Sequence, residues 1–430
     1  MIAQCSVHLA KPLRIQGNII ETYLPGTRIG EVCEIHKSLL ESEILGFAQV
    51  IGFNNERVIL SLLTDNFGFS PDNAILPTGK SLQVNVGPSL AGSILDATGI
   101  VRARLDGNTV HPNSGWENIL INGVPRDFID RIPISEPLFT GVKAIDALLT
   151  CGRGQRMGIF ASAGCGKSTL MNMIVENAEA DIYVIALIGE RGREVTEMIE
   201  ELRRSSRNSQ IILVYATSDL SSMERCNAAQ IATTIAEYFC EHGRNVILFF
   251  DSITRYARAL RDVALSSGEL PARRGYPASV FETLPKLLER PGNFKTGSIT
   301  AFYTILIESE DEADVIGDEV RSILDGHIYL SRKLAAKGHY PAIDVLQSVS
   351  RLFPQITALH HKKAAAQFRD LLVRQQDMQL YLDLGEYQRG ENVLNDEAFD
   401  KKPNMVKFLI QGIDEIADIA STLEKLYECV

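Results

Sequence analysis

Residues 161–168, ASAGCGKS, place two glycines, a lysine and a serine at the spacing of a phosphate-binding loop. The segment follows an apolar, strand-like run, RMGIF, and opens a helix-like run, STLMNMIVEN. In this context backbone N–H groups at Gly164 and Gly166 turn toward a β-phosphate, and Lys167 reaches the β- and γ-phosphates. The pattern predicts a triphosphate site built from Ser162, Ala163, Gly164, Cys165, Gly166, Lys167, Ser168 and Thr169. Ala161 replaces the first glycine of the pattern, and a simple glycine turn is the alternative.

A magnesium nucleotide also requires oxygen ligands from the protein. Ser168 would supply a hydroxyl, and Asp251 follows the wholly apolar run VILFF at a predicted strand end. We therefore expect Ser168 and Asp251 to hold Mg²⁺. The alternative for Asp251 is that it caps the helix ITRYARALRDVA, because aspartate is a favoured cap residue.

Hydrolysis requires a group that orients or deprotonates the attacking water. Glu190, in GERGRE after the strand-like run IYVIALI, is the predicted base. Glu194 and Glu197 compete, but they lie further into a helix, where solvent or Arg193 is the expected partner. Surface ion pairing of the whole cluster is the alternative.

Arginine commonly stabilises the charge on a phosphoryl group in transfer, and it can come from an adjacent subunit. Arg351, after PAIDVLQSVS, is placed in the sequence to do so. Its position alone does not distinguish such a finger from a surface arginine.

From residue 154 onward, strand-like runs alternate with helix-like stretches, the pattern of a parallel sheet with crossover helices. The runs are RMGIF, IYVIALI, IILVY, VILFF and SITAFYTILI. One crossover helix has apolar residues at helical spacing and ends before Gly243, a predicted C-terminal cap. Because parallel strands end at one edge, this α/β core would gather the residues above at a single site.

The regions before and after this core have different residue patterns, and the chain is therefore predicted to have three domains. Short β-rich segments between residues 15 and 63 favour a small antiparallel barrel, and residues 79–137 resemble a loop-rich connection. Beyond residue 354 the pattern is helical. We expect a β-barrel domain over 1–75, an α/β nucleotide-binding domain with its connecting segment over 76–353, and a helical domain over 354–430.

Composition narrows the function classes for this 430-residue chain. A formal charge of −11 argues against nucleic acid as a main partner, because phosphate backbones are bound by basic surfaces. The seven scattered cysteines indicate reduced thiols. The N-terminal stretch lacks the core of a secretory signal, and no run approaches the roughly 18 apolar residues of a membrane span. We expect a cytoplasmic protein that associates with membranes only peripherally.

The segments ASAGCGKS, LIGERGRE, VILFFDSITRYARALRD and PAIDVLQSVSR resemble the ATP synthase α/β superfamily. Within it, LTCGRGQRMGIFASAGCGK, ATSDLSSMERCNAA and SGELPARRGYPASVF are similar to the type III secretion ATPases. The spellings at 150–152 and 162–165 favour the virulence-type, needle-forming branch over the flagellar export ATPases. The resemblance covers nearly the whole chain and implies a RecA-like P-loop core.

This resemblance implies a homohexameric ATP hydrolase with sites between subunits, docked at the cytoplasmic base of an inner-membrane export apparatus. It also implies that the β-barrel over 1–75 serves oligomerisation and that residues 76–353 form the ATPase domain. Its partners would be stalk, stator and export-gate proteins, and chaperone–effector complexes that it separates and unfolds. The family's water-polarising glutamate falls on Glu190, its arginine finger on Arg351 and an adenine-stacking aromatic on Tyr340. Arg193 and Arg255 match arginines of the same active-site network. For Tyr340, simple packing is the alternative.

Several other functions are compatible with parts of this sequence. A flagellar export ATPase or a rotary ATP synthase subunit would share most motifs. A ring helicase would need a basic, RNA-binding N-terminal domain, which the acidic balance disfavours. A nucleotide-binding module without turnover would not need Glu190. Oxidation of Cys165 could block the loop, and the acidic run at 308–319 could bind a metal, although an inert thiol and a solvated loop are the simpler interpretations.

Overall fold

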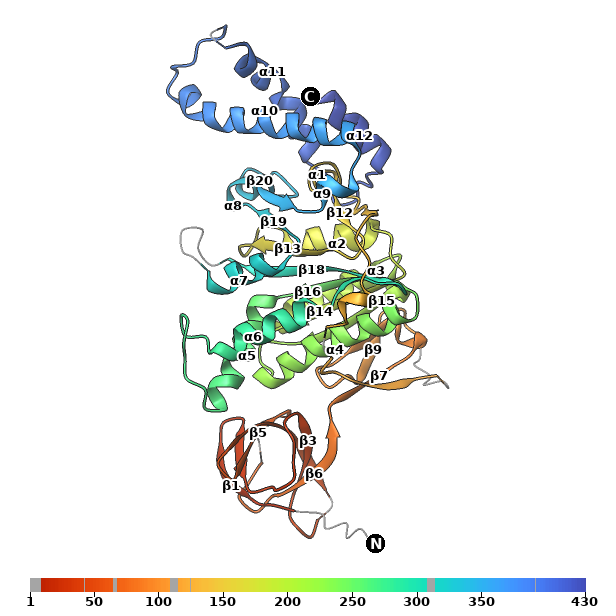
Figure 1. The fold of residues 1–430 in the computed structure, drawn as a ribbon, viewed down its shortest axis with the longest axis vertical. Coiled ribbons are helices and arrows are strands. Elements are labelled where there is room, and N and C mark those ends of the chain that lie inside the picture. The colour runs from red at the N-terminus through yellow and green to blue at the C-terminus, as the bar shows by residue number, and fades with distance from the viewer. Residues whose placement is uncertain are drawn as a thin grey trace.

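The computed structural model describes residues 9–41, 43–64, 68–108, 115–123, 125–307, 314–390 and 392–430. Three regions follow one another along the long axis, as Figure 1 shows. A β-barrel carries the N-terminus, a layered α/β region forms the middle, and helices that carry the C-terminus cover the opposite end. The α/β fold with a barrel before it and helices after it is as predicted.

The N-terminal region is an antiparallel six-stranded sheet in the order β1-β2-β5-β4-β3-β6. Its strands are β1 (Pro12–Gln16), β2 (Ile19–Thr22), β3 (Glu31–His36), β4 (Ile44–Asn54), β5 (Arg57–Leu62) and β6 (Ala74–Ser81). A bridge between Ala10 and Ile75 joins the two edges and closes the barrel. Along β3 buried and half-buried residues alternate, so one face of the strand fills the barrel interior. The small barrel predicted from the sequence is confirmed.

The connection after the barrel is more ordered than expected. It contains β7 (Gln83–Val86), β8 (Ser93–Leu95), β9 (Val101–Arg104) and β10 (Glu117–Leu120). β8 pairs in parallel with β15 and antiparallel with β9, which extends the central sheet. The prediction of a mere loop-rich connection was therefore wrong here, because three buried residues are too short a run to stand out among glycines and prolines.

The central sheet runs in the order β20-β19-β13-β18-β16-β14-β15-β8-β9. Its further strands are β13 (Arg156–Ala161), β14 (Ile182–Ile188), β15 (Ile211–Ala216), β16 (Asn245–Asp251), β18 (Ser298–Leu306), β19 (Gly326–Leu330) and β20 (Ile343–Ser350). The strands from β19 to β8 pair in parallel, whereas β20 and β9 pair antiparallel at the edges. A short strand, β17 (Gly292–Asn293), pairs antiparallel with β18. The five strands predicted from apolar runs are all present.

Both faces of this sheet are buried against helices. Along β14, Tyr183, Ile185 and Leu187 pack in one apolar cluster, and the residues between them pack in the other. The first face meets α1 (Lys143–Leu148), α2 (Lys167–Asn177) and α3 (Gly192–Arg204). The second meets α4 (Ser222–Glu241), α5 (Ile253–Ser266), α6 (Ala278–Leu288) and α7 (Val315–Ile323). Gly243 adopts a positive φ of 78° just past α4, as predicted for a C-terminal cap.

The C-terminal region is helical. It comprises α9 (Phe353–Ile356), α10 (Leu359–Asp383), α11 (Val393–Leu409) and α12 (Ile419–Glu428). α8 (Arg332–Ala336) lies before it, between β19 and β20. Phe368 and Phe408 pack together with ring centroids 5.5 Å apart, and both belong to the cluster that continues into the central region. The helical end is thus fused to the core by shared apolar packing.

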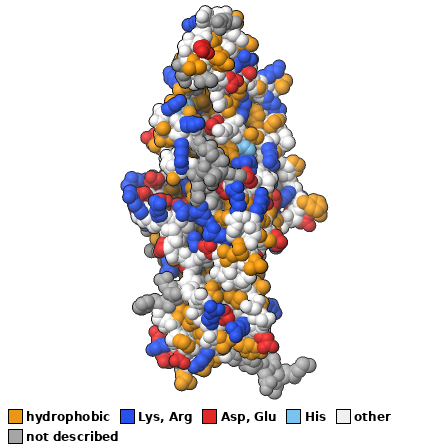
Figure 2. All heavy atoms as spheres, turned by 90° about the vertical axis from the view of Figure 1, so that its left-hand side faces the viewer, with side chains coloured by type: hydrophobic (Ala, Val, Ile, Leu, Met, Phe, Trp, Pro, Cys, Tyr) orange, Lys and Arg blue, Asp and Glu red, His pale blue; other side chains and the backbone are white. Residues whose placement is uncertain are grey.

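Figure 2 shows one long side of the molecule, where Lys and Arg side chains gather over the central region beside acidic ones. Within the described ranges, every helix is too short or too polar to traverse a bilayer. Six cysteines are buried free thiols, and Cys5 lies outside the described residues. Residues 308–313 of the acidic run also lie outside them, whereas Asp314 caps α7.

Candidate active site

The phosphate-binding loop joins β13 to α2. Gly164 and Gly166 have φ values of 81° and 85°, a conformation that favours glycine, and Gly166 is the N-cap of α2. Ala161 is the last residue of β13 and fully buried, so its methyl group packs inside the sheet rather than in the loop. The side chain of Cys165 also lies in the apolar core. The loop therefore offers its backbone, and its helix N-terminus, to an anion.

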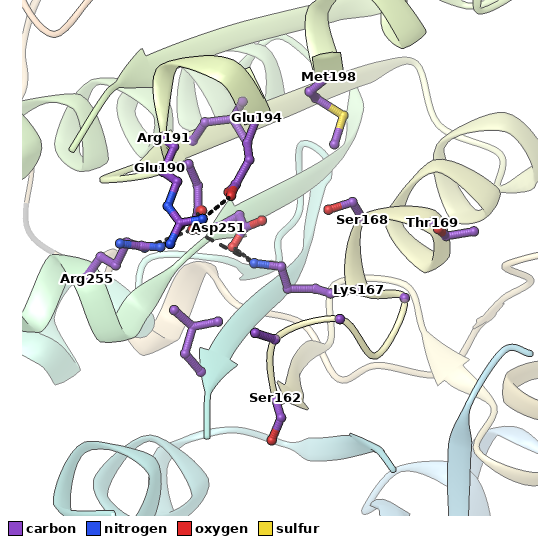
Figure 3. A pocket seen from close by; sticks show the side chains of 15 residues that line it. Ser162, Lys167, Ser168, Thr169, Glu190, Arg191, Glu194, Met198, Asp251 and Arg255 are labelled. Atoms are coloured by element: carbon purple, nitrogen blue, oxygen red, sulfur yellow. Dashed lines mark hydrogen bonds and ion pairs between the residues drawn. The ribbon is translucent and has the colours of Figure 1, made fainter. Parts of the chain in front are cut away.

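A cavity of about 400 Å³ opens beside this loop. Figure 3 shows side chains from the ends of several strands converging on it. Its lining comprises Ser162, Ala163, Gly164, Gly166, Lys167, Ser168, Thr169, Leu187, Glu190, Arg191, Glu194, Met198, Asp251, Arg255 and Leu306. All predicted loop residues except the buried Cys165 thus line one cavity.

Asp251 ends β16 and is 3% exposed. Its Oδ1 accepts hydrogen bonds from Lys167 Nζ at 2.5 Å and from the Thr304 hydroxyl at 2.7 Å. The side chain that caps α5 is that of Ser252, which accepts from the Arg255 backbone N–H. Asp251 therefore faces the cavity and is not the cap of the following helix.

Glu190 follows β14 and is buried. Arg255 donates to both of its carboxylate oxygens, at 3.0 and 3.3 Å, and Lys167 Nζ lies 3.9 Å away. Burial raises the pKa of Glu190 to about 7, and the charge of Asp251 and a hydrogen bond with Glu194 act in the same direction. Lys167 and Arg255 oppose this rise. A carboxyl with a pKa near neutrality can take up and release a proton at physiological pH.

The other charged residues of this turn are divided between the cavity and solvent. Glu194 lines the cavity beside Arg191, with Oε1 3.5 Å from the guanidinium, and its side chain is also 46% exposed, in keeping with the expected solvent-facing position. Arg193 points away, is 86% exposed and pairs with Glu197 at 2.8 Å. Within this chain, Arg255 rather than Arg193 therefore orders Glu190. No sequence pattern shows which of Arg193 and Glu194 faces the cavity. The direction in which the chain enters α3 decides it.

Tyr340 and Arg351 lie outside the lining of the cavity in their own chain. The Tyr340 ring borders the loop, since a Cβ at Gly166 would meet its Cε1 at 3.3 Å. Arg351 directly follows β20 and is exposed, and its backbone N–H donates to the carbonyl of Asp325 at 3.0 Å. The backbone at Arg351 is thus fixed to the sheet edge while its side chain projects from the surface.

The donor set of the cavity suits a hard divalent cation. Ser168 and Asp251 both line the cavity and would offer the oxygen ligands that Mg²⁺ prefers, usually together with phosphate oxygens. Among the described residues there is no group of three His, Cys, Asp or Glu side chains that could cage a metal alone. Three carboxylates, Glu190, Glu194 and Asp251, share the cavity and would repel a bare triphosphate. A divalent cation bound with the nucleotide would offset that repulsion.

A glycine-rich loop after a parallel strand, a lysine on that loop and two buried carboxylates at neighbouring strand ends define a P-loop nucleotide hydrolase. Comparison with known proteins identifies the family within this class. Residues 141–350 match the ATP synthase alpha/beta family, nucleotide-binding domain, and residues 357–428 match the T3SS EscN ATPase C-terminal domain.

Several relatives match over almost their full length. The SPI-1 type 3 secretion system ATPase of Salmonella typhi is 55% identical over 97% of this chain and 96% of its own. The assembled ATPase EscN of enteropathogenic E. coli superposes with a TM-score of 0.91 at 43% identity, covering 98% of this chain and 99% of that one. The flagellum-specific ATP synthase of Bacillus subtilis is 43% identical over 97% of this chain and 94% of its own. The chain belongs to the type 3 secretion system ATPases of the ATP synthase alpha/beta family, and it is an ATP hydrolase.

Proposed function

We propose that this chain is the motor of a virulence-type type III secretion system and works as a homohexamer whose ATP sites lie between subunits. One observation carries the proposal. The chain holds the loop, Lys167, Glu190 and Asp251 in one cavity, while Arg351 projects from its surface outside that cavity. A neighbouring copy could therefore complete each site with its own Arg351.

In this mechanism the N-terminus of α2 and Lys167 hold the phosphates, and Arg255 keeps the Glu190 carboxylate oriented toward the γ-phosphate side. Glu190 accepts a proton from the attacking water. Mg²⁺ held by Ser168 and Asp251 would supply charge neutralisation of the phosphates. Arg351 of the adjacent subunit stabilises the charge of the transferring phosphoryl group, and Arg193, which is exposed and pairs with Glu197, belongs to the same network.

Tyr340 is proposed to stack on the adenine. Its ring borders Gly166, the N-cap of α2, but does not belong to the lining of the cavity that holds Lys167 and Glu190, which leaves it beside the phosphate cradle, where a base could stack. Ser162, Ala163, Gly164, Cys165 and Thr169 complete the nucleotide-binding set through the loop and the first turn of α2.

The proposed partners are those of a secretion apparatus. EscN was solved as an assembly and in complex with its central stalk EscO, which supports self-assembly and a stalk partner for this chain. By the same resemblance we propose stator and export-gate proteins, chaperone–effector complexes as substrates for release and unfolding, and peripheral binding at the cytoplasmic side of the inner membrane. Nucleic acid is not a proposed partner.

A flagellar export ATPase is the second candidate, since flagellum-specific relatives are also similar across the chain. The higher identity to a secretion-system ATPase, 55% against 43%, favours the virulence-type assignment. A rotary ATP synthase subunit is the third, and it would depend on a distinct partner chain for turnover.

The test is ATPase rate per chain across a concentration series, with mass measured on the same samples. A rate that rises steeply as hexamers form supports shared sites. A flat rate through the monomer range argues for a self-sufficient monomer and against the proposal. Complementation of strains lacking the ATPase of an injectisome or of a flagellum then separates the first two candidates.

A further inference from the structure

A buried glutamine links the helical C-terminal region to the nucleotide domain. Gln411 lies between α11 and α12 and is 3% exposed. Its Oε1 accepts from the backbone N–H of Lys143 at 2.8 Å, and its Nε2 donates to the carbonyls of Gly141 at 2.7 Å and Glu415 at 2.8 Å. Every donor hydrogen and the acceptor oxygen are thus used, as buried amides require.

The anchor on the nucleotide-domain side is itself firmly held. The buried carboxylate of Asp146 accepts hydrogen bonds from the backbone N–H groups of Thr140 and Gly141, at 2.7 and 2.9 Å. Lys143 Nζ donates to the carbonyl of Ile410 and to Glu415, at 2.9 and 3.0 Å. Residues 410–415 are therefore fastened to the start of α1 from two sides.

Gln411 is also connected, through Tyr340, to the phosphate-binding loop. The backbone N–H of Gln411 donates to the carbonyl of Tyr340 at 2.9 Å. The Tyr340 ring in turn borders Gly166 of the phosphate-binding loop. A side chain that fixes the position of residue 411 therefore also fixes the backbone at Tyr340.

We propose that Gln411 is a positioning residue for the base-binding side of the nucleotide site and acts through Tyr340. The inference rests on the proposed role of Tyr340 in stacking on adenine. Gln411 does not belong to the lining of the cavity beside the loop, so its loss should misplace the aromatic ring without altering the phosphate cradle. The base would then bind less well, whereas the chemical step would proceed at its usual rate.

The experiment uses the full-length assembled protein and two substitutions. Gln411→Leu removes all three side-chain hydrogen bonds, and Gln411→Glu keeps the size and an acceptor oxygen but loses both donors. KM for ATP should rise about three- to tenfold, with kcat within about twofold of the parent, as expected for the loss of one or two net hydrogen bonds. The inhibition constant of inorganic tripolyphosphate, a competitor that lacks a base, should stay unchanged.

A matched control is available in the same region. Gln375 is a buried glutamine whose Nε2 donates to the carbonyl of Ala398 at 2.7 Å and to the Met405 sulfur at 3.2 Å, so its hydrogen bonds join α10 to α11 within the C-terminal helices. Gln375→Leu should leave KM for ATP unchanged. Thermal unfolding of each variant shows which are folded, and Gln411→Glu provides the test if Gln411→Leu does not fold.

Tyr340→Ala separates the stacking role of Tyr340 from the positioning role of Gln411. If this variant leaves KM for ATP unchanged, the stacking role of Tyr340 fails, and the role of Gln411 fails with it. If Tyr340→Ala raises KM but folded Gln411 variants do not, Gln411 does not position Tyr340, and stacking stands. A parallel loss of tripolyphosphate affinity in the Gln411 variants would mean general distortion of the loop, which also overturns the inference.

Discussion

Lys167 and Asp251 form a direct ion pair, with Nζ 2.5 Å from Oδ1, inside the cavity beside the phosphate-binding loop. A triphosphate offers oxygens that compete for the same ammonium group. We therefore expect nucleotide binding to draw Lys167 from Asp251 toward the phosphates, which leaves the Asp251 carboxylate available to a cation. The pair keeps each charge compensated while the site waits for nucleotide.

Lys167→Ala should abolish turnover. The substitution removes the only lysine among the residues that line the cavity. Asp251 and Glu190, both buried, then lose the Lys167 ammonium group that lies close to both carboxylates. We expect a loss of at least about 100-fold in kcat, as for other groups that stabilise charge in the transition state. Phosphate release at saturating ATP measures it. Turnover within a few-fold of the parent would contradict the role assigned to Lys167.

Glu190→Gln should bind ATP but hydrolyse it about 10²- to 10⁴-fold more slowly, because the amide keeps the shape yet cannot accept the proton. Equilibrium binding of a fluorescent ATP analogue and single-turnover hydrolysis separate the two effects. Glu200→Gln is the control, since Glu200 lies on α3 but pairs with Arg203 at the surface. An active Glu190→Gln would transfer the base role to Glu194, the other glutamate of the cavity lining.

The rate should depend on pH near neutrality. Glu190 must be deprotonated to act as a base, and its pKa is raised to about 7 by burial and by Asp251. The value of kcat/KM should therefore rise with pH through about 7 and level off above it, rather than rise near the usual glutamate value.

The pH dependence of kcat/KM in Arg255→Met tests whether Glu190 is the group that titrates. Arg255 lowers the pKa of Glu190, so its removal should move the inflection to higher pH. A profile without an inflection between pH 5 and 8 in the parent protein would show that Glu190 does not limit the reaction.

The catalytic elements were predictable because each lies at the end of an uninterrupted apolar run. Strands of this kind mark β13, β14 and β16, and a parallel sheet must bring their carboxyl ends to one edge. The P-loop spacing adds the anion site. Lys167, Glu190 and Asp251 could therefore be assigned to one cavity before any contact was known.

Other features depend on contacts between distant segments, which leave no periodic pattern. Gln411 lies about 270 positions from Gly141 and follows an ordinary helix, so nothing local distinguishes it from a surface amide. Arg193 and Glu194 are neighbours with similar polarity, yet only Glu194 faces the cavity. β8 is too short to be recognised without its partner β15. The positions of these residues and of β8 are set by tertiary contacts and could not be predicted from local sequence.

Arg290 should be a strong determinant of stability. It is 1% exposed, and its guanidinium donates to both carboxylate oxygens of Glu237, at 2.8 and 2.5 Å, and to the carbonyl of Ile121 at 3.3 Å. Arg290→Met leaves Glu237 largely buried without its cation, which costs about 3–5 kcal/mol. Urea unfolding of the purified protein measures the change.

The double variant Arg290→Met with Glu237→Leu is the companion experiment. Removing both charges should recover part of the lost stability, because the penalty comes mainly from the uncompensated carboxylate. If the double variant is as unstable as the sum of the two single variants, the pair does not act as a unit.

Arg351→Ala tests whether the site is completed by a neighbour. Because the side chain lies outside its own cavity, nucleotide affinity should change little, whereas turnover of the assembled protein should fall by about 10³-fold or more.

Mixing Arg351→Ala chains with Lys167→Ala chains makes the test decisive. In a mixed ring, a Lys167→Ala chain can lend its intact arginine to the intact loop of an Arg351→Ala neighbour, so activity should return although each variant alone is inactive. Native mass spectrometry of the same mixture shows whether the chains have co-assembled. Mixed rings that form but stay inactive would argue that Arg351 acts within its own subunit or not at all, because only an arginine acting across the interface can be supplied by another chain.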